Sequence, residues 1–242
     1  MSRSKRIAIV TGASRGLGEV IARVLASHDF DLVVGARHAP ALERVAESLR
    51  PSGSRVVAVA GDIVNPEARS KLIEAAWELG GLDLLVNNAS VLGGVAPLLE
   101  FDVPRFGQIL PVNVGAPMIL TQLAAPLLAG RHGLVVNITS DAAHGAYPGW
   151  GPYGASKAAL ELLTRTLAAE AGDRGLSFVL VDPGDMRTRM HQDAHPGEDI
   201  SDRPLPEVTA PFWEWLFDQH PGDVHGRRFA AQQQDAPWLS TV

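Results

Sequence analysis

Short apolar runs rich in β-branched residues alternate with longer amphipathic segments along most of the chain. The runs are apolar at consecutive positions, a pattern typical of strands that are buried on both faces. The segments between them follow the 3.6-residue periodicity of helices. This alternation predicts right-handed β–α–β units. We therefore expect an α/β fold in which helices cover both faces of a doubly wound parallel sheet, giving three layers, α/β/α.

The expected elements follow one another without a linker, so the chain is predicted to form a single domain over residues 1–242. The predicted strands are 7–10, 32–36, 56–60, 82–87, 133–139, 177–182 and 228–231. The predicted helices are 17–27, 39–49, 66–79, the proline-interrupted 103–128, 153–171 and 212–217.

The pattern breaks after Gly184, and residues 191–209 are polar with three prolines. A surface loop of this length is often functional, and we expect residues 191–218 to form a substrate lid. Trp213, Trp215 and Phe217 could cap an apolar substrate, pack on the core or meet a partner subunit.

The composition excludes several classes of function. The formal net charge is −6, which disfavours nucleic acid as a partner because phosphate binding needs a basic face. The absence of cysteine excludes thiolate catalysis and thiolate metal sites. No uninterrupted apolar run reaches the ~20 residues that span a bilayer, and no signal peptide is visible. We expect a cytoplasmic protein without a membrane partner.

A glycine-rich segment links the first predicted strand to the first predicted helix. It reads Thr11-Gly12-Ala13-Ser14-Arg15-Gly16-Leu17-Gly18. Glycine lets the backbone turn sharply and approach an anion, while the helix start offers unpaired N–H groups to a pyrophosphate. A bare glycine trio also fits a plain turn, but its place between strand and helix predicts a Rossmann-type dinucleotide site.

The end of the second predicted strand indicates which dinucleotide binds. Sites for NAD place an acidic residue there to bind the ribose 2′-hydroxyl. This chain has Ala36 followed by Arg37, and Arg15 lies in the glycine-rich turn. Two cations and no carboxylate favour a 2′-phosphate, so we predict NADP(H) as the cofactor. The alternative is that both arginines are solvated surface charges.

Tyr153 and Lys157 lie four residues apart at the start of a predicted helix, so they share one face. A free phenol has a pKa of ~10 and is a poor acid–base group at neutral pH. We expect the ammonium of Lys157 to lower the pKa of Tyr153 toward the working range. Ser140, at the end of the preceding predicted strand, could hold a substrate oxygen beside the tyrosine.

Together these motifs resemble the classical short-chain dehydrogenase/reductase family over roughly residues 5–190. The turn at residues 11–18 matches the family's TGxxxGxG cradle, and Asn87-Asn88-Ala89 is similar to the structural motif after its fourth strand. Asn113, Ser140, Tyr153 and Lys157 match the catalytic tetrad. The cofactor contacts that the resemblance implies are Gly12, Ser14, Arg15, Gly16, Leu17, Gly18, Arg37, Asp62, Ile63, Asn88, Ala89, Tyr153, Lys157, Pro183, Gly184, Met186 and Thr188.

The resemblance also implies a reaction and an assembly. A ketone, or a 3-oxoacyl group, and a secondary alcohol would be interconverted by hydride transfer, with Tyr153 giving the carbonyl oxygen a proton and Ser140 holding that oxygen. Lys157 would contact the nicotinamide ribose, and Asn113 would hold a water that relays protons to Lys157. The helices that carry Asn113 and Tyr153 would form a homodimer or homotetramer.

Ser90 is a departure from the family pattern, because it stands where the NNAG motif has glycine. This puts the close approach of that loop to the cofactor in question.

The small-molecule carbonyl or alcohol substrate is not identified by the sequence. His144, Tyr147 and Trp150, between the serine and the tyrosine, are candidates to line its pocket, with surface packing as the alternative. His191 and His195 fit solvated loop residues better than metal ligands, so no metal site is predicted.

Two rival functions keep the same fold. A catalytically silent protein that senses NADP(H) would normally lack the tyrosine or the lysine, and both are present. A dehydratase or epimerase of this fold is typically longer, with a larger substrate region.

Overall fold

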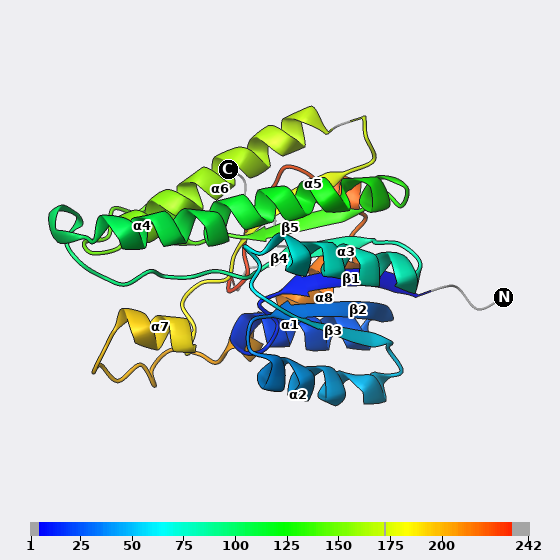
Figure 1. Cartoon of the computed structure of the whole chain (residues 1–242), viewed down its shortest axis with the longest axis horizontal. Helices are drawn as coiled ribbons and strands as arrows, with labels where there is room; N and C mark the ends of the chain where they lie inside the picture. Colours follow the sequence, from blue (N-terminus) through cyan, green and yellow to red (C-terminus); the bar gives the residue numbers. More distant parts are fainter. Residues whose placement is uncertain (1–4, 172, 234–242) are drawn as a thin grey trace.

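The computed structural model describes residues 5–171 and 173–233. Its centre is a seven-stranded sheet in the order β3-β2-β1-β4-β5-β6-β7, and every pair of neighbours is parallel (Figure 1). The strands are β1 (Arg6–Thr11), β2 (Phe30–Ala36), β3 (Val56–Ala60), β4 (Leu84–Asn87), β5 (Leu134–Ile138), β6 (Ser177–Asp182) and β7 (Arg228–Ala230).

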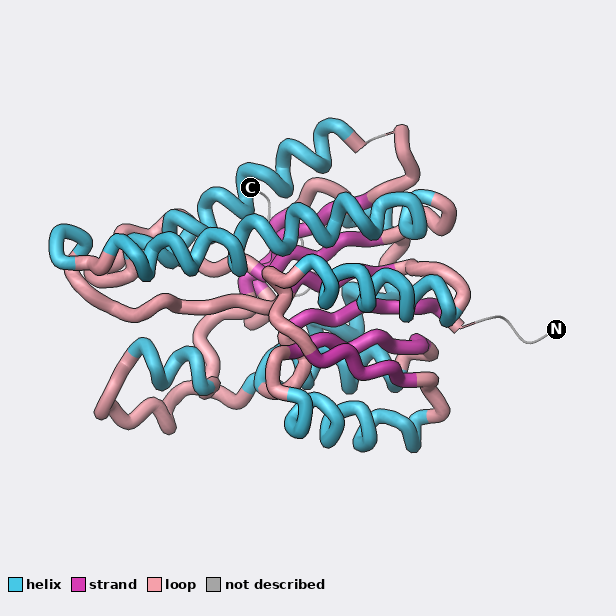
Figure 2. The backbone as a smooth tube through the Cα atoms, viewed as in Figure 1, coloured by secondary structure: helices cyan, strands magenta, loops and turns pink. Residues whose placement is uncertain are grey.

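Helices cover both faces of this sheet, as the cyan and magenta tubes of Figure 2 show. The helices are α1 (Gly16–Ser27), α2 (Ala39–Leu49), α3 (Pro66–Leu79), α4 (Val103–Leu110), α5 (Ala116–Ala129), α6 (Gly151–Glu170), α7 (Arg189–Ala194), α8 (Ala210–Asp218) and α9 (Pro221–Val224). One apolar core packs α1, α2 and α8 on one face, and a second packs α3, α5 and α6 on the other. The predicted three-layer, doubly wound parallel sheet is confirmed.

The predicted helix 103–128 is divided by a π-helical turn at Pro111–Gly115. Pro111 has no N–H to donate, and the ladder of a regular helix cannot continue unchanged through it. Asn113 lies inside this turn and is only 1% exposed. The turn therefore directs Asn113 into the protein.

By length and composition, the helical segment Val103–Ala129 is long and apolar enough to cross a membrane. Core helices of soluble proteins pass the same test, and 39% of the apolar window is buried within the protein. The exposed large apolar side chains of this segment are Val103, Phe106, Ile119 and Leu123.

The segment after Gly184 differs from the predicted lid. Residues 191–209 were expected to be loop, but they include the end of α7 and a 3-10 helix at Pro206–Thr209. Phe212 and Trp213 of α8 are fully buried, and Trp213 Nε1 donates to Thr209 Oγ1 at 2.9 Å. Because α8 belongs to the core, the range 191–218 is too long for a lid.

The strand order reverses at β1. The chain runs from β1 outward to β2 and β3, then crosses back to β4 on the other side. In sheets of this kind the connections diverge at such a point and leave a crevice at the carboxyl ends of the strands. The fold therefore places an open site beside the ends of β1 and β4.

Candidate active site

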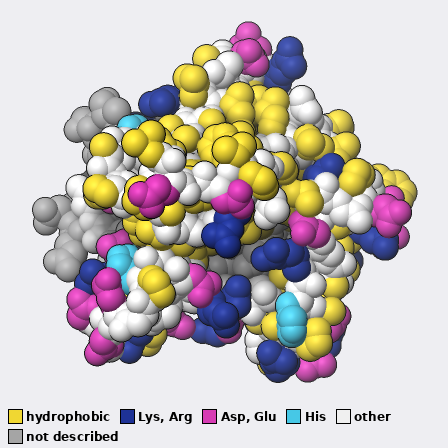
Figure 3. Space-filling view, turned by 60° about the vertical axis from the view of Figure 1, so that its left-hand side comes forward, with side chains coloured by type: hydrophobic (Ala, Val, Ile, Leu, Met, Phe, Trp, Pro, Cys, Tyr) yellow, Lys and Arg dark blue, Asp and Glu magenta, His cyan; other side chains and the backbone are white. Residues whose placement is uncertain are grey.

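A cavity of about 1410 Å³ lies at the carboxyl ends of the strands, where the crevice was expected. Its wall runs from the glycine-rich turn after β1 to Tyr153 and Lys157 on α6. In Figure 3 the lower half of the molecule is hollowed, with Lys and Arg side chains around the opening. One continuous cavity thus joins the predicted cofactor motif to the predicted catalytic pair.

The glycine-rich turn is shaped by its backbone. Gly12 and Gly16 have φ of +68° and +58°, a region that side-chain-bearing residues rarely adopt. Asn88 Nδ2 donates to the carbonyl of Thr11 at 2.8 Å, which ties the loop after β4 to the turn. A Cβ on Gly12 would lie 2.8 Å from the same nitrogen. The close packing of the two loops therefore requires glycine.

Helix α1 begins at this turn, and in the described part of the chain its N-cap residue, Arg15, makes no capping hydrogen bond. Its first N–H groups and the positive end of its dipole face the cavity side that Gly16 and Leu17 line. This set of donors suits a pyrophosphate. The residues present therefore fit a dinucleotide.

Three arginines surround the end of the cavity beside β2. Arg15 and Arg37 line it as predicted, and the sequence analysis missed Arg44 of α2, which joins them together with His38. Arg44 lies about one and a half turns into α2, which starts two residues after Arg37, so the helical periodicity could have revealed it. This end of the cavity carries the positive charge that a 2′-phosphate needs.

Most of the other predicted cofactor residues also line the cavity: Ser14, Gly18, Asp62, Ile63, Asn88, Ala89, Pro183, Met186 and Thr188. Gly184 does not. It has a φ of +71°, its N–H donates to Asp182 Oδ1 at 3.0 Å, and a Cβ there would meet Gln232. Gly184 therefore shapes the turn after β6.

Tyr153 and Lys157 sit on one face of α6 and are buried, with 8% and 3% of their surface exposed. Nζ of Lys157 lies 5.6 Å from the Tyr153 ring centroid and donates to the carbonyl of Ile138 at 2.7 Å. Ser140 lies just beyond β5, where its Oγ donates to Asp141 Oδ1 at 3.0 Å, and its hydroxyl lowers the pKa of the Tyr153 phenol. The structure brings these three predicted residues together.

Asn113 contributes to the same site by holding the loop after β4 in place. Its Oδ1 accepts from the Val91 N–H at 2.9 Å and from Ser90 Oγ at 3.1 Å. Its Nδ2 donates to the carbonyl of Val91 at 2.9 Å and to Ser156 Oγ at 3.0 Å. The Asn113 amide thus holds the serine that replaces the family's glycine, and Ser90 lines the cavity without closing it.

Burial controls the protonation of Tyr153 and Lys157. It raises the pKa of Tyr153, and the nearby hydroxyls of Ser140 and Ser90 lower it by less. Burial lowers the pKa of Lys157 to about 8, against the opposing charges of Asp182 and Glu161. The expectation of a lowered pKa at Tyr153 is wrong for this structure, because desolvation of the phenol outweighs the effect of these hydroxyls. The phenol is held in its protonated, donor form.

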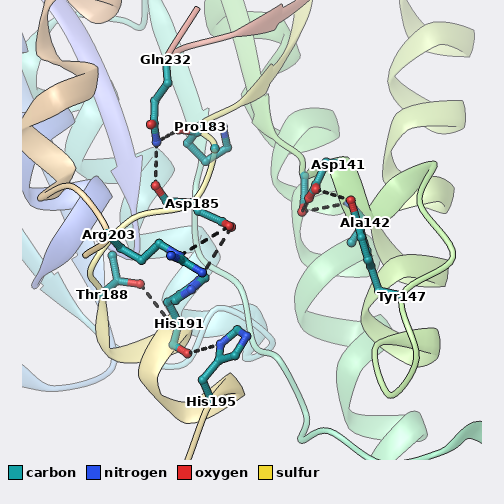
Figure 4. Close-up of polar contacts among 12 residues, drawn as sticks. Asp141, Ala142, Tyr147, Pro183, Asp185, Thr188, His191, His195, Arg203 and Gln232 are labelled. Atoms are coloured by element: carbon teal, nitrogen blue, oxygen red, sulfur yellow. Dashed lines mark hydrogen bonds and ion pairs between the residues drawn. The ribbon is translucent and has the colours of Figure 1, made fainter. Parts of the chain in front are cut away.

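The structure does not place the three candidate substrate residues on the cavity wall. Nε2 of His144 lies 2.8 Å from Glu161 Oε2. The Tyr147 hydroxyl donates to Asp141 Oδ2 at 2.7 Å, as Figure 4 shows. The Trp150 ring packs edge-on against Tyr153 with centroids 5.8 Å apart. Their sequence position between Ser140 and Tyr153 brings all three near the site, but His144 and Tyr147 are engaged by carboxylates, and Trp150 packs on Tyr153 without lining the cavity.

His191 and His195 belong to α7 and the turn that follows it. Their rings stack at 4.6 Å, and Asp185 Oδ1 lies 3.8 Å from His191 Nδ1 (Figure 4). His191 is 9% exposed, so the expectation of a solvated loop histidine is wrong for it. Among the described residues no group of three or more His, Asp or Glu could hold a metal ion.

Several residues of the wall were not among the predicted site residues. They are residues 91–94 after β4 and Arg187, Arg189 and Met190 around α7. Leu205, Pro206 and Glu207 also line the cavity, and they lie within the range 191–218 that was expected to form a substrate lid. The rule that ligands bind beyond the carboxyl ends of strands indicates the general location of the segments after β4 and β6. No local motif marks the individual residues.

Comparison with known proteins agrees with this geometry. A sequence model of the family described as short chain dehydrogenase matches residues 6–199. Dehydrogenase/reductase SDR family member 4 of Bos taurus is 34% identical over 185 residues, which cover 76% of this chain and 66% of that protein. The chain thus spans just under two thirds of the length of this relative.

Solved structures extend the likeness over nearly the whole chain. A short chain dehydrogenase from Shigella flexneri, complexed with NADP, is 30% identical with a TM-score of 0.88, covering 94% of this chain and 97% of that one. An alcohol dehydrogenase from Thermococcus sibiricus, complexed with 5-hydroxy-NADP, is 28% identical with a TM-score of 0.84, covering 96% and 99%. The glycine-rich cradle, the parallel sheet and these matches agree, and the chain belongs to the short-chain dehydrogenase/reductase family.

Proposed function

We propose that this oxidoreductase uses NADP(H) to interconvert a ketone, or a 3-oxoacyl group, and a secondary alcohol, with Tyr153 as the general acid and base. The observation that carries the proposal is the shared cavity. A protonated phenol and a buried ammonium line one end of a cavity whose other end is a dinucleotide cradle, and Ser140 directly follows Thr139 of the cavity wall.

The preference for NADP(H) is supported by charge. Arg15, Arg37 and Arg44 line the cavity where β2 ends, and Ala36 stands where an NAD site has a carboxylate. Two structural relatives were solved with NADP or a derivative of it. A 2′-phosphate at this end would gain charge-assisted hydrogen bonds and meet no repelling carboxylate at the strand end.

When bound, the reduced nicotinamide would supply the hydride. Tyr153 would donate its phenolic proton to the carbonyl oxygen, and Ser140 Oγ would offer that oxygen a second hydrogen bond. The raised pKa of Tyr153 suits reduction, because the phenol keeps its proton until a more basic alkoxide develops. Lys157 would hold positive charge beside the phenol and the nicotinamide ribose, and Asn113 would keep the loop of Ser90 and Val91 in place.

A second copy of the chain is the partner that the surface favours. Apolar side chains gather in Figure 3 over the upper part of the molecule, which Figure 1 shows to be the α4–α6 layer. Exposed members of this layer are Val103, Phe106, Ile119, Leu123 and Leu162. An apolar area of this kind marks an association surface, and we propose a homodimer or homotetramer formed through it.

The test is NADPH consumption with a panel of carbonyl compounds, including a 3-oxoacyl thioester, a steroid ketone, a sugar and a polyketide-type ketone. The proposal predicts loss of NADPH absorbance with at least one of them and an alcohol product identified by mass spectrometry. A protein that binds NADPH but consumes none with any carbonyl would instead match the silent sensor, which neither the described residues nor the comparisons support.

A further inference from the structure

Glu161 is a buried carboxylate that the proposed reaction does not use. It lies on α6 one turn after Lys157, on the same face, and is 0% exposed. A carboxylate taken out of water is costly unless charges and hydrogen bonds compensate it. Its partners therefore show what the buried charge holds in place.

Both carboxylate oxygens of Glu161 face the segment that carries Ser140. Oε1 accepts a hydrogen bond from Thr139 Oγ1 at 2.8 Å, and Thr139 directly precedes Ser140. Oε2 lies 2.8 Å from Nε2 of His144, at ion-pair distance but not in hydrogen-bond alignment. Glu161 thus contacts the chain immediately before Ser140 and four residues after it.

Arg228 connects this carboxylate to the far edge of the sheet. Its Nε donates to Glu161 Oε1 at 3.0 Å, and its Nη2 donates to Asp182 Oδ2 at 3.0 Å and to the carbonyl of Ser140 at 3.4 Å. Arg228 lies on β7, beyond residues 6–199 of the family match. The C-terminal strand therefore reaches the backbone of Ser140 through a side chain.

We propose that Glu161 is a positioning residue that fixes Ser140 through Thr139 and Arg228 and, one helical turn from Lys157 on the same buried face of α6, holds negative charge beside its ammonium. The inference rests on the proposed function, because Ser140 and Lys157 act in that reaction. The charged groups that act on Lys157 are Asp182 from β6 and Glu161 from α6, and both oppose the effect of burial. Tyr153 is the remaining titratable group beside Lys157.

The first test compares Glu161→Gln with Glu170→Gln, a change at an exposed glutamate of the same helix. Glu161→Gln keeps the size of the side chain and removes its charge. We expect kcat to fall about 10- to 100-fold, the cost of a misplaced catalytic group, with the NADPH Kd unchanged, because the cradle lies elsewhere. Glu170→Gln should change neither. A folded Glu161→Gln protein with the kcat of wild type overturns the proposal.

The second test needs no substrate. The chain has three lysines, Lys5, Lys71 and Lys157, so NMR of labelled lysine side chains can follow Lys157 individually. Its pKa, about 8 in the native chain, should fall in Glu161→Gln and stay constant in Glu170→Gln. An unchanged Lys157 titration overturns the proposal. A wild-type protein that reduces no carbonyl defeats the proposed function, while this titration still decides the role of Glu161.

If Glu161→Gln does not fold, Arg228→Lys and His144→Ala replace it. Arg228→Lys keeps the charge but removes the fork that joins Glu161, Asp182 and the carbonyl of Ser140. His144→Ala changes a side chain that is 54% exposed, so folding should tolerate it. We expect Arg228→Lys to lower kcat with NADPH affinity retained, and His144→Ala to lower it less. Full kcat in both variants overturns the proposal.

Discussion

Two sides of the cavity are built by different means: the cofactor side, from the glycine-rich turn to Arg37 and Arg44, and the catalytic side, around Tyr153 and Lys157. The cofactor side depends on backbone shape: Gly12 and Gly16 adopt positive φ within one short segment, and the start of α1 supplies the N–H groups. The catalytic side depends on side chains that meet from distant parts of the chain. Asn113 contacts Ser156, and Glu161 contacts Arg228, 67 residues further on.

Because of this difference, cofactor affinity and turnover should respond to different substitutions. A change on the catalytic side should alter turnover and leave cofactor affinity intact, whereas a change in the cradle should do the opposite. Three buried charged residues, Lys157, Glu161 and Asp182, lie on the catalytic side, whereas Arg69, which donates to the carbonyl of Ile63, lies on the cofactor side. The catalytic side should therefore carry the stronger dependence on pH.

The largest effect is expected from Tyr153→Phe, which removes only the phenolic oxygen. Loss of a general acid costs about 10²- to 10⁴-fold in rate, so kcat should fall by that factor while the NADPH Kd stays near the wild-type value. Tyr147→Phe is the matched control, since the chain has only these two tyrosines. Steady-state kinetics and fluorescence titration measure both quantities. Retained turnover in Tyr153→Phe would refute its role as the acid.

Gly18→Ala should have the opposite effect. A Cβ at Gly18 would lie 2.5 Å from Asn88 Nδ2 and closer still to the carbonyl oxygen of Gly12. Overpacking of this kind costs about 1–3 kcal/mol, so the NADPH Kd should rise about 10- to 100-fold. Gly107→Ala is the control, because nothing lies within 4 Å of a Cβ there. Equal NADPH affinity in the two variants would show that the turn does not form the cradle.

The charge buried beside Tyr153 predicts a pH effect on stability. The pKa of Lys157 is about 8 in the native protein and near 10.5 in the unfolded chain. Between these values the unfolded chain binds a proton that the native protein does not, so the free energy of unfolding should rise with pH. The rise should be on the order of 1–3 kcal/mol.

Urea unfolding at several pH values measures this rise as the difference between wild type and Lys157→Met. Lys71→Met, at an exposed position of α3, is the control and should show no such trend. If the difference in free energy of unfolding between wild type and Lys157→Met stays constant from pH 8 to pH 10.5, Lys157 is not desolvated in the native protein.

The smallest expected effect is on cofactor preference. Arg37→Asp replaces a cation with a carboxylate that can accept from a ribose 2′-hydroxyl. The ratio of NADH to NADPH affinity should shift by about tenfold, equivalent to about 1.4 kcal/mol, because Arg15 and Arg44 remain. Arg165→Asp, at an exposed position of α6, should leave the ratio unchanged. The same ratio in both variants would remove Arg37 from cofactor recognition.

Most residues that the sequence assigned to the cofactor lie along one cavity in the structure, because their sequence signals are local. The bounds of α2, β3, α3 and β6 agree with the predicted ranges. The parallel order of the strands followed from their consecutive apolar positions, and the glycine spacing located the cradle. Arg44 was missed although the periodicity of α2 could have revealed it.

The catalytic side was predicted only where a short motif marks it. Tyr153 and Lys157 share a helical face and could be paired from their spacing. The contact of His144 with Glu161 and the reach of Arg228 to Ser140 depend on how β5, β6 and β7 are placed side by side. The raised pKa of Tyr153 depends on burial, which the spacing of two residues does not encode.

The most direct test of the account is a fluorescence titration of the native protein with NADPH and, in parallel, with NADH. The account predicts saturable NADPH binding and NADH binding that is at least about tenfold weaker, the difference that a charge-assisted 2′-phosphate site produces. Equal affinity for both would contradict the assignment of Arg15, Arg37 and Arg44 to the 2′-phosphate. Binding of neither would contradict the cradle itself.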